Sequence, residues 1–216
     1  LYQKEIIRKC NRVGKPVITA TQMLQSMIDH PRPTRAEASD VANAILDGTD
    51  AVMLSGVWHW GAYPVRAVEM MVKIAAITER AMPCREERPF EDKLLTYSIT
   101  DAISQATCEI AEDLDVRLIV TSTWSGYTAR QVAKERPRKA IVAVTPNPAA
   151  YRRLALVWGV LPVLAEQYGN TDEMFEIVER TVLGLGLAKH GDLLAVTGGL
   201  PVGGGGRTNF LKVHQL

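Results

Sequence analysis

Short apolar segments alternate with helical patterns along the whole chain, and this alternation constrains the fold more than any other feature. In the first part, residues 4–11 read as the end of a helix, and residues 17–20 and 51–54 read as strands. The second strand is apolar on both faces, as a buried parallel strand is. Strands that alternate with helices imply a mostly parallel sheet covered on both faces, so we expect an α/β fold.

Two helices of this first part have clear starting signals. Thr34 and Glu37 have the spacing of a capping box, in which the hydroxyl and the carboxylate satisfy free backbone amides. Pro64 suits the first turn of the next helix, because its fixed φ matches and no amide is lost. On that helix we expect a buried face made by Val65, Val68, Val72 and Ala75.

A second alternation follows. One helix carries Ile99, Ala102, Ile103, Ala106 and Ile110 on one face. Strands are predicted at 118–121, 140–144, 160–164, 193–197 and 209–214. Further helices are predicted around 130–134, at 149–156, and from a Thr171 cap to about Leu187.

The stretch from Met82 to Asp92 is the only one with linker character, because it combines Pro83 and Pro89 with a run of charged residues. We therefore divide the chain into a first domain at 1–81, a linker at 82–95 and a second domain at 96–216. The first residues, Leu1-Tyr2-Gln3-Lys4, have mid-helix composition, and we expect the chain to be part of a longer protein.

Composition excludes some classes of partner. The formal net charge of +1 over 216 residues offers no electrostatic case for binding nucleic acid or a membrane surface. No apolar run approaches the ~20 residues of a membrane span. Cys10, Cys84 and Cys108 are odd in number and lack metal-ligand spacing, so we expect reduced thiols in a cytoplasmic protein and no metal site in this chain.

Hydroxyl side chains follow both predicted strands of the first part. Thr21 ends the strand in the segment 14–24, and Ser55 ends the strand in 47–56. A lone hydroxyl at such a position is usually a helix cap or a turn residue. Together with residues 31–44, these segments closely resemble the later barrel strands of the pyruvate kinase family, and the resemblance continues to Leu216. It implies the last two βα units of a (β/α)8 TIM barrel, followed by the family's three-layer α/β domain.

The resemblance implies roles for particular residues. Thr21 matches the threonine beside the substrate, held there for orientation or proton relay, and Ser55 matches the serine of the next strand end. Arg35 matches a residue at an interface of the family's homotetramer; a solvated arginine at a helix start is the alternative. The family transfers a phosphoryl group from phosphoenolpyruvate to ADP with Mg2+ and K+. Its metal ligands and its lysine would precede Leu1, so we expect this polypeptide alone to be inactive.

One segment departs from the family pattern. After Ser55-Gly56 the family has Glu-Thr-Ala, a variable residue and Gly, whereas this chain has Val57-Trp58-His59-Trp60-Gly61. A carboxylate and a hydroxyl are lost and two indoles enter. A reshaped rim of the active site, local divergence and a sequence error all fit this pattern.

A second candidate site lies in the second domain. Thr123, Ser125 and Thr128, with Gly126 between them, run from a strand into a helix, where hydroxyls and free amides favour anions. The glycine-rich loop at 198–207 includes Gly203, Gly204, Gly205 and Gly206 and allows close backbone approach to a ligand. In the resembling family these two segments form an effector pocket for sugar phosphates; a merely structural loop is the alternative.

Trp124 stands where some members that respond to fructose bisphosphate carry a lysine. A second phosphate would lose a partner there, so a monophosphorylated sugar, AMP or no effector is expected. We interpret the chain as the C-terminal part of a pyruvate kinase. The alternatives are a separately made, non-catalytic module that binds a phosphorylated metabolite, and a truncated gene product without independent function.

Overall fold

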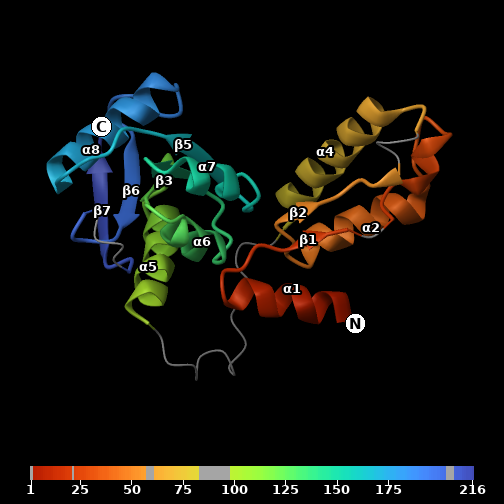
Figure 1. The fold of residues 1–216 in the computed structure, drawn as a ribbon, viewed down its shortest axis with the longest axis horizontal. Coiled ribbons are helices and arrows are strands. Elements are labelled where there is room, and N and C mark those ends of the chain that lie inside the picture. Colours follow the sequence, from red (N-terminus) through yellow and green to blue (C-terminus); the bar gives the residue numbers. More distant parts are fainter. Residues whose placement is uncertain (1, 21, 57–60, 83–97, 203–206) are drawn as a thin grey trace. The chain divides into compact units, whose positions relative to one another are not determined.

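The computed structural model describes residues 2–20, 22–56, 61–82, 98–202 and 207–216. The chain forms two compact units, Leu1–Pro83 and Cys84–Leu216 (Figure 1). The segments 57–60 and 203–206, most of the predicted linker, and Thr21 lie outside the described residues.

The first unit contains the predicted order of helices and strands. Its elements are α1 (Tyr2–Arg12), β1 (Ile18–Thr19), the 3-10 helix η1 (Gln25–Ile28), α2 (Arg35–Leu46), β2 (Ala51–Val52) and α4 (Pro64–Ala81). β1 and β2 pair in parallel, with Ile18 beside Ala51. An apolar cluster of η1, α2 and α4 forms the core, and Met23, Met27, Val41 and Met71 are among its buried members. The sequence pattern did not predict η1.

Two expectations about burial in this unit were wrong. On α4 the valines at 65, 68 and 72 are exposed, with Val65 at 64% and Val72 at 61%, and the buried positions are Ala67, Met71 and Thr78. α4 carries two apolar stripes, and the stripe that includes Met71 packs against α2, so periodicity identified the wrong one. The second predicted strand is only partly buried, and Met53 beside it is 43% exposed.

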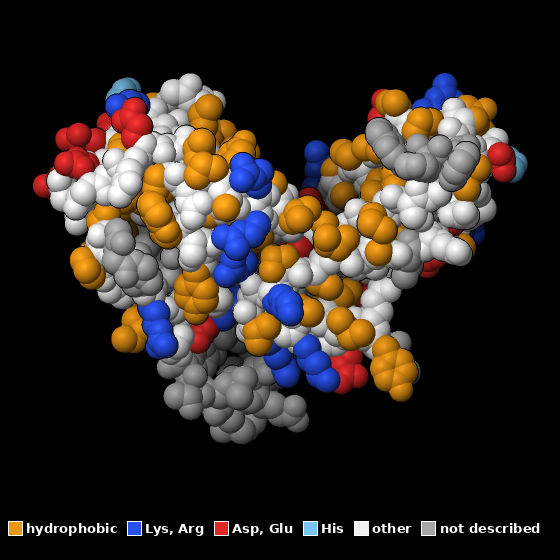
Figure 2. All heavy atoms as spheres, in the orientation of Figure 1, with side chains coloured by type: hydrophobic (Ala, Val, Ile, Leu, Met, Phe, Trp, Pro, Cys, Tyr) orange, Lys and Arg blue, Asp and Glu red, His pale blue; other side chains and the backbone are white. Residues whose placement is uncertain are grey.

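Apolar side chains therefore lie at the surface of the first unit, as the space-filling view shows (Figure 2). The exposed ones on α1 and α4 are Tyr2, Ile6, Val65, Val68, Val72 and Ile77. Among the described residues, no helix is long and apolar enough to cross a membrane.

The predicted capping box starts α2 and also holds η1. Thr34 accepts from the Glu37 amide at 3.3 Å, and the Glu37 carboxylate accepts from the Thr34 amide at 2.8 Å. The same carboxylate accepts from the amide and the hydroxyl of Ser26, at 2.7 and 2.5 Å. Partial burial acts to raise the pKa of Glu37, but these hydrogen bonds outweigh it and lower the pKa to about 2. One ionised side chain thus joins two elements of the core.

The second unit is a three-layer α/β domain. Its sheet runs in the order β5-β4-β3-β6-β7, and only β7 is antiparallel to its neighbour. The strands are β3 (Leu118–Ser122), β4 (Ile141–Thr145), β5 (Val160–Leu164), β6 (Leu193–Gly198) and β7 (Phe210–Gln215). The helices are α5 (Ile99–Asp113), α6 (Tyr127–Ala133), α7 (Pro148–Leu154) and α8 (Thr171–Gly184). The predicted, mostly parallel sheet is confirmed.

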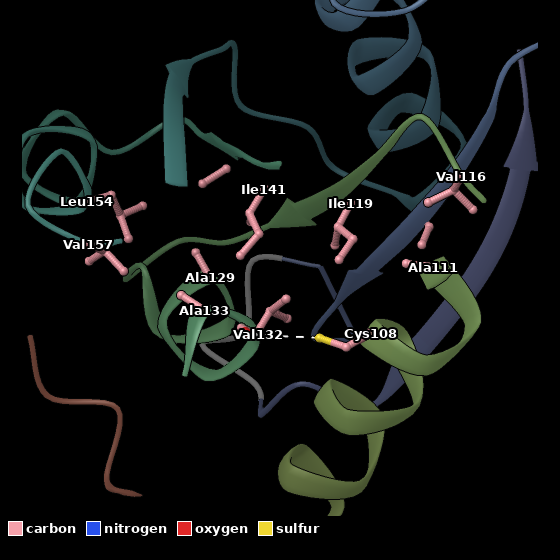
Figure 3. Close-up of a cluster of buried hydrophobic side chains, with 12 residues drawn as sticks. Cys108, Ala111, Val116, Ile119, Ala129, Val132, Ala133, Ile141, Leu154 and Val157 are labelled. Carbon is pink, nitrogen blue, oxygen red and sulfur yellow. Dashed lines mark hydrogen bonds between the residues drawn. The ribbon is translucent and has the colours of Figure 1, made fainter. Parts of the chain in front are cut away.

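Helices cover both faces of this sheet, as expected. On one face, α5, α6 and the end of α7 contribute Cys108, Val132 and Leu154 to a cluster that packs on Ile119 and Ile141 (Figure 3). On the other face, α8 contributes Ile177, Val178 and Val182. They belong to a cluster with the alternate residues of the same strands, which include Val120 and Val196. The central strand β3 is buried on both sides.

The face that α5 turns to the interior is not its isoleucine stripe. Ile99 is 69% exposed, whereas the buried positions are the small side chains Thr100, Ser104, Thr107, Cys108 and Ala111. Small side chains allow a helix to lie close to the sheet, and a hydroxyl can be buried when it is hydrogen-bonded. Thr107 meets this requirement by donating to the Ile103 carbonyl of its own helix at 2.7 Å.

The start of α8 also differs from the prediction. Asn170, not Thr171, is the N-cap, and its side chain accepts from the Glu173 amide at 2.9 Å. The Glu173 carboxylate in turn accepts from the Gly169 amide at 2.7 Å, so the turn is closed from both sides. The helix ends at Gly184, before Leu187, because the chain turns into a left-handed conformation at Gly186.

The stability of the protein should depend on pH through the ionisation of the Glu37 carboxylate. Its folded-state pKa lies below the unfolded value, so its contribution is present above pH ~4.5 and is lost as the pH falls toward 2. We expect Glu37→Gln to lower the free energy of unfolding by about 1 kcal/mol at pH 7 and to flatten its fall between pH 4.5 and 2. Urea unfolding at a series of pH values measures both effects.

The matched control is Glu69→Gln, on the exposed side of α4. In this variant the free energy of unfolding should fall between pH 4.5 and 2 as steeply as in the parent protein. If the free energy of unfolding of Glu37→Gln fell as steeply as that of the parent protein, this carboxylate would not couple folding to pH.

Candidate functional site

A pocket of about 440 Å³ opens at the C-terminal edge of the sheet in the second unit. This volume suits a small organic ligand. The pocket lies where β3 and β6 end, and it is lined by Ser122, Thr123, Trp124, Ser125, Tyr127, Thr128, Arg130, Pro146, Gln167, Tyr168, Gly199, Pro201, Val202 and Arg207.

The topology of the sheet explains this position. After β3 the chain turns into α6 on one face of the sheet, whereas after β5 it crosses to α8 on the opposite face. These two connections diverge at the C-terminal edge of the sheet, and together with the segment after β6 they surround a crevice. Ligands of open α/β sheets bind at this kind of switch point.

The hydroxyl-rich turn between β3 and α6 forms one wall. Thr123 and Thr128 are buried, Ser125 is exposed, and all of them line the pocket. Between them Gly126 has a φ of 81°, and a Cβ on it would lie 3.1 Å from Leu154. The left-handed conformation favours glycine, and a Cβ here would push the Leu154 side chain aside. The turn therefore brings together the predicted residues of this site, except those outside the described part of the chain.

Each of these hydroxyl groups already accepts a hydrogen bond within the protein. Thr123 accepts from the Gly126 amide at 3.0 Å, and Ser125 accepts from the Tyr127 amide at 3.4 Å. Thr128 accepts from the hydroxyl of Thr208 at 2.9 Å. Among the described residues, none of these hydroxyls donates its own proton to an acceptor. A hydroxyl has one proton and two lone pairs, so each remains available as a donor to a ligand.

The charged residues of the pocket wall are Arg130 and Arg207. Burial and the neighbouring Arg153 guanidinium lower the pKa of Arg130. Among the described residues, neither Arg130 nor Arg207 forms an ion pair, and the pocket lining contains no carboxylate. Free hydroxyl protons and uncompensated positive charge together favour an anionic ligand.

A second wall comes from the segment before α8, and sequence reasoning missed it. Tyr168 shares a short hydrogen bond with Ser122 at the end of β3, and burial raises the pKa of its phenol group. No motif marks Tyr168 or Gln167 in the sequence, whereas Ser122 belongs to the predicted hydroxyl-rich turn. Gln167 and Tyr168 reach the pocket because the segment after β5 leads the chain back across the C-terminal edge of the sheet. Arg130 ends the predicted anion-binding segment, but no role of its own was predicted for it.

The candidate residues of the first unit are not assembled into a site by the described residues. Ser55 is exposed just after β2, and Arg35 is exposed in the first turn of α2. Thr21 and the Val57–Trp60 segment lie outside the described residues, as do Gly203, Gly204, Gly205 and Gly206. The described residues contain no group of three His, Cys, Asp or Glu side chains that could hold a metal ion.

Comparison with known proteins agrees with both halves of this architecture. Residues 101–214 match the family model "Pyruvate kinase, alpha/beta domain", and residues 1–68 match "Pyruvate kinase, barrel domain". The pyruvate kinases of Geobacillus stearothermophilus and Bacillus licheniformis are 56% and 53% identical over 216 residues, the whole of this chain and 37% of each relative. That of Clostridium acetobutylicum is 50% identical over 219 residues, again all of this chain and 46% of the relative.

The chain thus spans less than half the length of these relatives. Its first unit corresponds to part of a barrel, and its second unit corresponds to the α/β domain. Since the α/β-domain model alone accounts for more than half of the residues, the chain belongs to the pyruvate kinase family.

Proposed function

We propose that this chain is the C-terminal part of a cytoplasmic, homotetrameric pyruvate kinase that transfers phosphate from phosphoenolpyruvate to ADP. Support comes from the two family models and from relatives 50–56% identical over its whole length. In this proposal residues 1–81 complete the barrel, 82–95 link the domains, and 96–216 form a regulatory domain. Thr21 and Ser55 would contribute to the active site, and Arg35 to an interface.

The intact enzyme would use Mg2+ and K+, whose ligands we place outside this chain. Phosphoryl transfer depends on cations that neutralise developing charge and hold the reacting groups in line. The described residues contain no suitable cluster of carboxylates, so no step of the transfer is assigned to them.

We further propose that the second unit binds a phosphorylated metabolite as an effector. The observation that carries this proposal is the set of hydroxyls at Thr123, Ser125 and Thr128, each of which accepts an internal hydrogen bond and keeps its own proton for a ligand. Phosphate oxygens are acceptors only, and they would also relieve the repulsion between Arg130 and its neighbour Arg153. Gly203 to Gly206 are expected to close over the ligand.

The ligand is expected to carry one phosphate, as a monophosphorylated sugar or AMP does. Trp124 is 48% exposed at the pocket wall, where a lysine would serve a second phosphate. An exposed indole instead offers an apolar surface to a sugar or base ring.

A separately made binding module is the alternative function. It is favoured by one observation: every described residue that lines the pocket lies between 122 and 207, within the second unit. Ligand binding alone therefore does not distinguish the two functions, whereas catalysis does.

Calorimetric titration with glucose 6-phosphate tests the effector site. We expect binding by the intact protein that carries these residues and none with glucose, because the phosphate supplies the acceptors. Ser125→Ala should weaken binding about tenfold or more through the loss of one hydrogen bond to a charged group. Ser39→Ala, on the exposed side of α2, is the control and should bind normally. Tight binding of fructose 1,6-bisphosphate would contradict the preference for one phosphate.

The 216-residue polypeptide alone is expected to show no pyruvate kinase activity, because its metal ligands and phosphate-binding lysine are assigned to other parts of the enzyme. A lactate dehydrogenase-coupled assay with phosphoenolpyruvate, ADP, Mg2+ and K+ measures this, with the intact enzyme as positive control. Turnover that depends on both the metal and phosphoenolpyruvate would contradict the expectation.

A further inference from the structure

The Thr208 side chain lies behind the pocket wall and is fully buried. Its hydroxyl donates to the Thr128 hydroxyl at 2.9 Å, across 80 positions of sequence. Its backbone carbonyl accepts from the hydroxyl of Thr100 at 3.3 Å, across 108 positions. Thr128 lines the pocket, and Thr208 follows Arg207, which also lines it. A buried chain of contacts thus runs from the first turn of α5 to the ligand-facing turn.

We infer that Thr208 is a positioning residue, which orients the hydroxyl of Thr128 so that its proton points to a bound anion. Thr208 gives its only hydroxyl proton to Thr128, so Thr128 is the acceptor in this pair. The proton of Thr128 is then directed elsewhere, and no described residue accepts it. Without the Thr208 hydroxyl, this constraint on the rotation of the Thr128 hydroxyl is lost.

Thr128 depends on a distant residue in a way that the other hydroxyls of the turn do not. Thr123 and Ser125 are oriented by the amides of Gly126 and Tyr127, in the same turn. These amides remain in place whenever the turn forms. Thr128 instead relies on a side chain from the segment between β6 and β7, so a single distant substitution can alter it.

The unusual burial on α5 fits this role. Thr100 is fully buried, and its hydroxyl donates a hydrogen bond to the Thr208 carbonyl. A second contact also involves the start of α5, since Lys134 after α6 forms an ion pair with Asp101 in the first turn of α5. Both contacts hold the start of α5, α6 and the segment at Thr208 together, so the two hydroxyls meet in a fixed geometry.

This inference rests on the proposed effector site, and the test separates the two. The intact protein carrying these residues is titrated with glucose 6-phosphate in the calorimeter, as Thr208→Val, Thr208→Ser and Thr107→Val variants. Thr208→Val keeps the shape and removes the hydroxyl, and Thr208→Ser restores it. Thr107→Val is the matched control, because Thr107 is equally buried but donates within its own helix. Thermal unfolding of each variant reports its stability.

We expect the dissociation constant to rise about fivefold in Thr208→Val and to remain within about twofold of the parent in Thr208→Ser and Thr107→Val. Equal affinity in Thr208→Val and the parent would overturn the positioning role and leave the effector site standing. So would equal weakening in the valine and serine variants, or in both valine variants, since loss of packing or of stability would then be the cause. No binding by the parent protein would overturn the effector site, and the inference with it.

Discussion

The pairing of β3 with β4 on one side and β6 on the other is the constraint on which the second unit depends. Because both neighbours are parallel to β3, the chain must cross the sheet to reach each of them, and it does so over opposite faces. One arrangement therefore buries the central strand in two apolar clusters and opens a crevice at its C-terminal end. The core and the pocket are two results of the same strand order.

The interior next to this crevice is partly polar, because buried hydroxyls of α5 form hydrogen bonds there. Isoleucines on the inner face of α5 would fill the space more fully, but they could not hydrogen-bond to the segment that carries Thr208. Thr100 does so, and Thr107 satisfies its own hydroxyl within the helix. Burying these hydroxyls sacrifices apolar contact near the site, whereas Cys108 and Ala111 restore it farther along the helix. Hydrogen bonds to the segment at Thr208 and apolar packing thus use different parts of the helix.

The first unit uses a different device, because its parallel strand pair is too short to organise a core. Helix packing stabilises this unit, and so does the Glu37 carboxylate. That carboxylate caps α2 and accepts a hydrogen bond from Ser26 in η1. The pattern of apolar residues predicted most elements in both units, together with the capping box and the mostly parallel sheet. It was wrong about the buried face of α4 and about the cap of α8. Each of these helices offers more than one plausible face or cap, and neighbouring elements decide between them.

By itself the sequence determined the family, the alternation of helices and strands, and the hydroxyl turn at Thr123 to Thr128, because these depend on residues close together in the chain. Tertiary structure decided which surfaces are buried and which distant residues share the pocket. Tyr168 reaches Ser122, and Thr208 reaches Thr128, only because the order of the strands brings their segments to the same edge of the sheet. The spacing of residues within short segments does not specify the order of the strands, so these contacts could not be predicted from the sequence pattern.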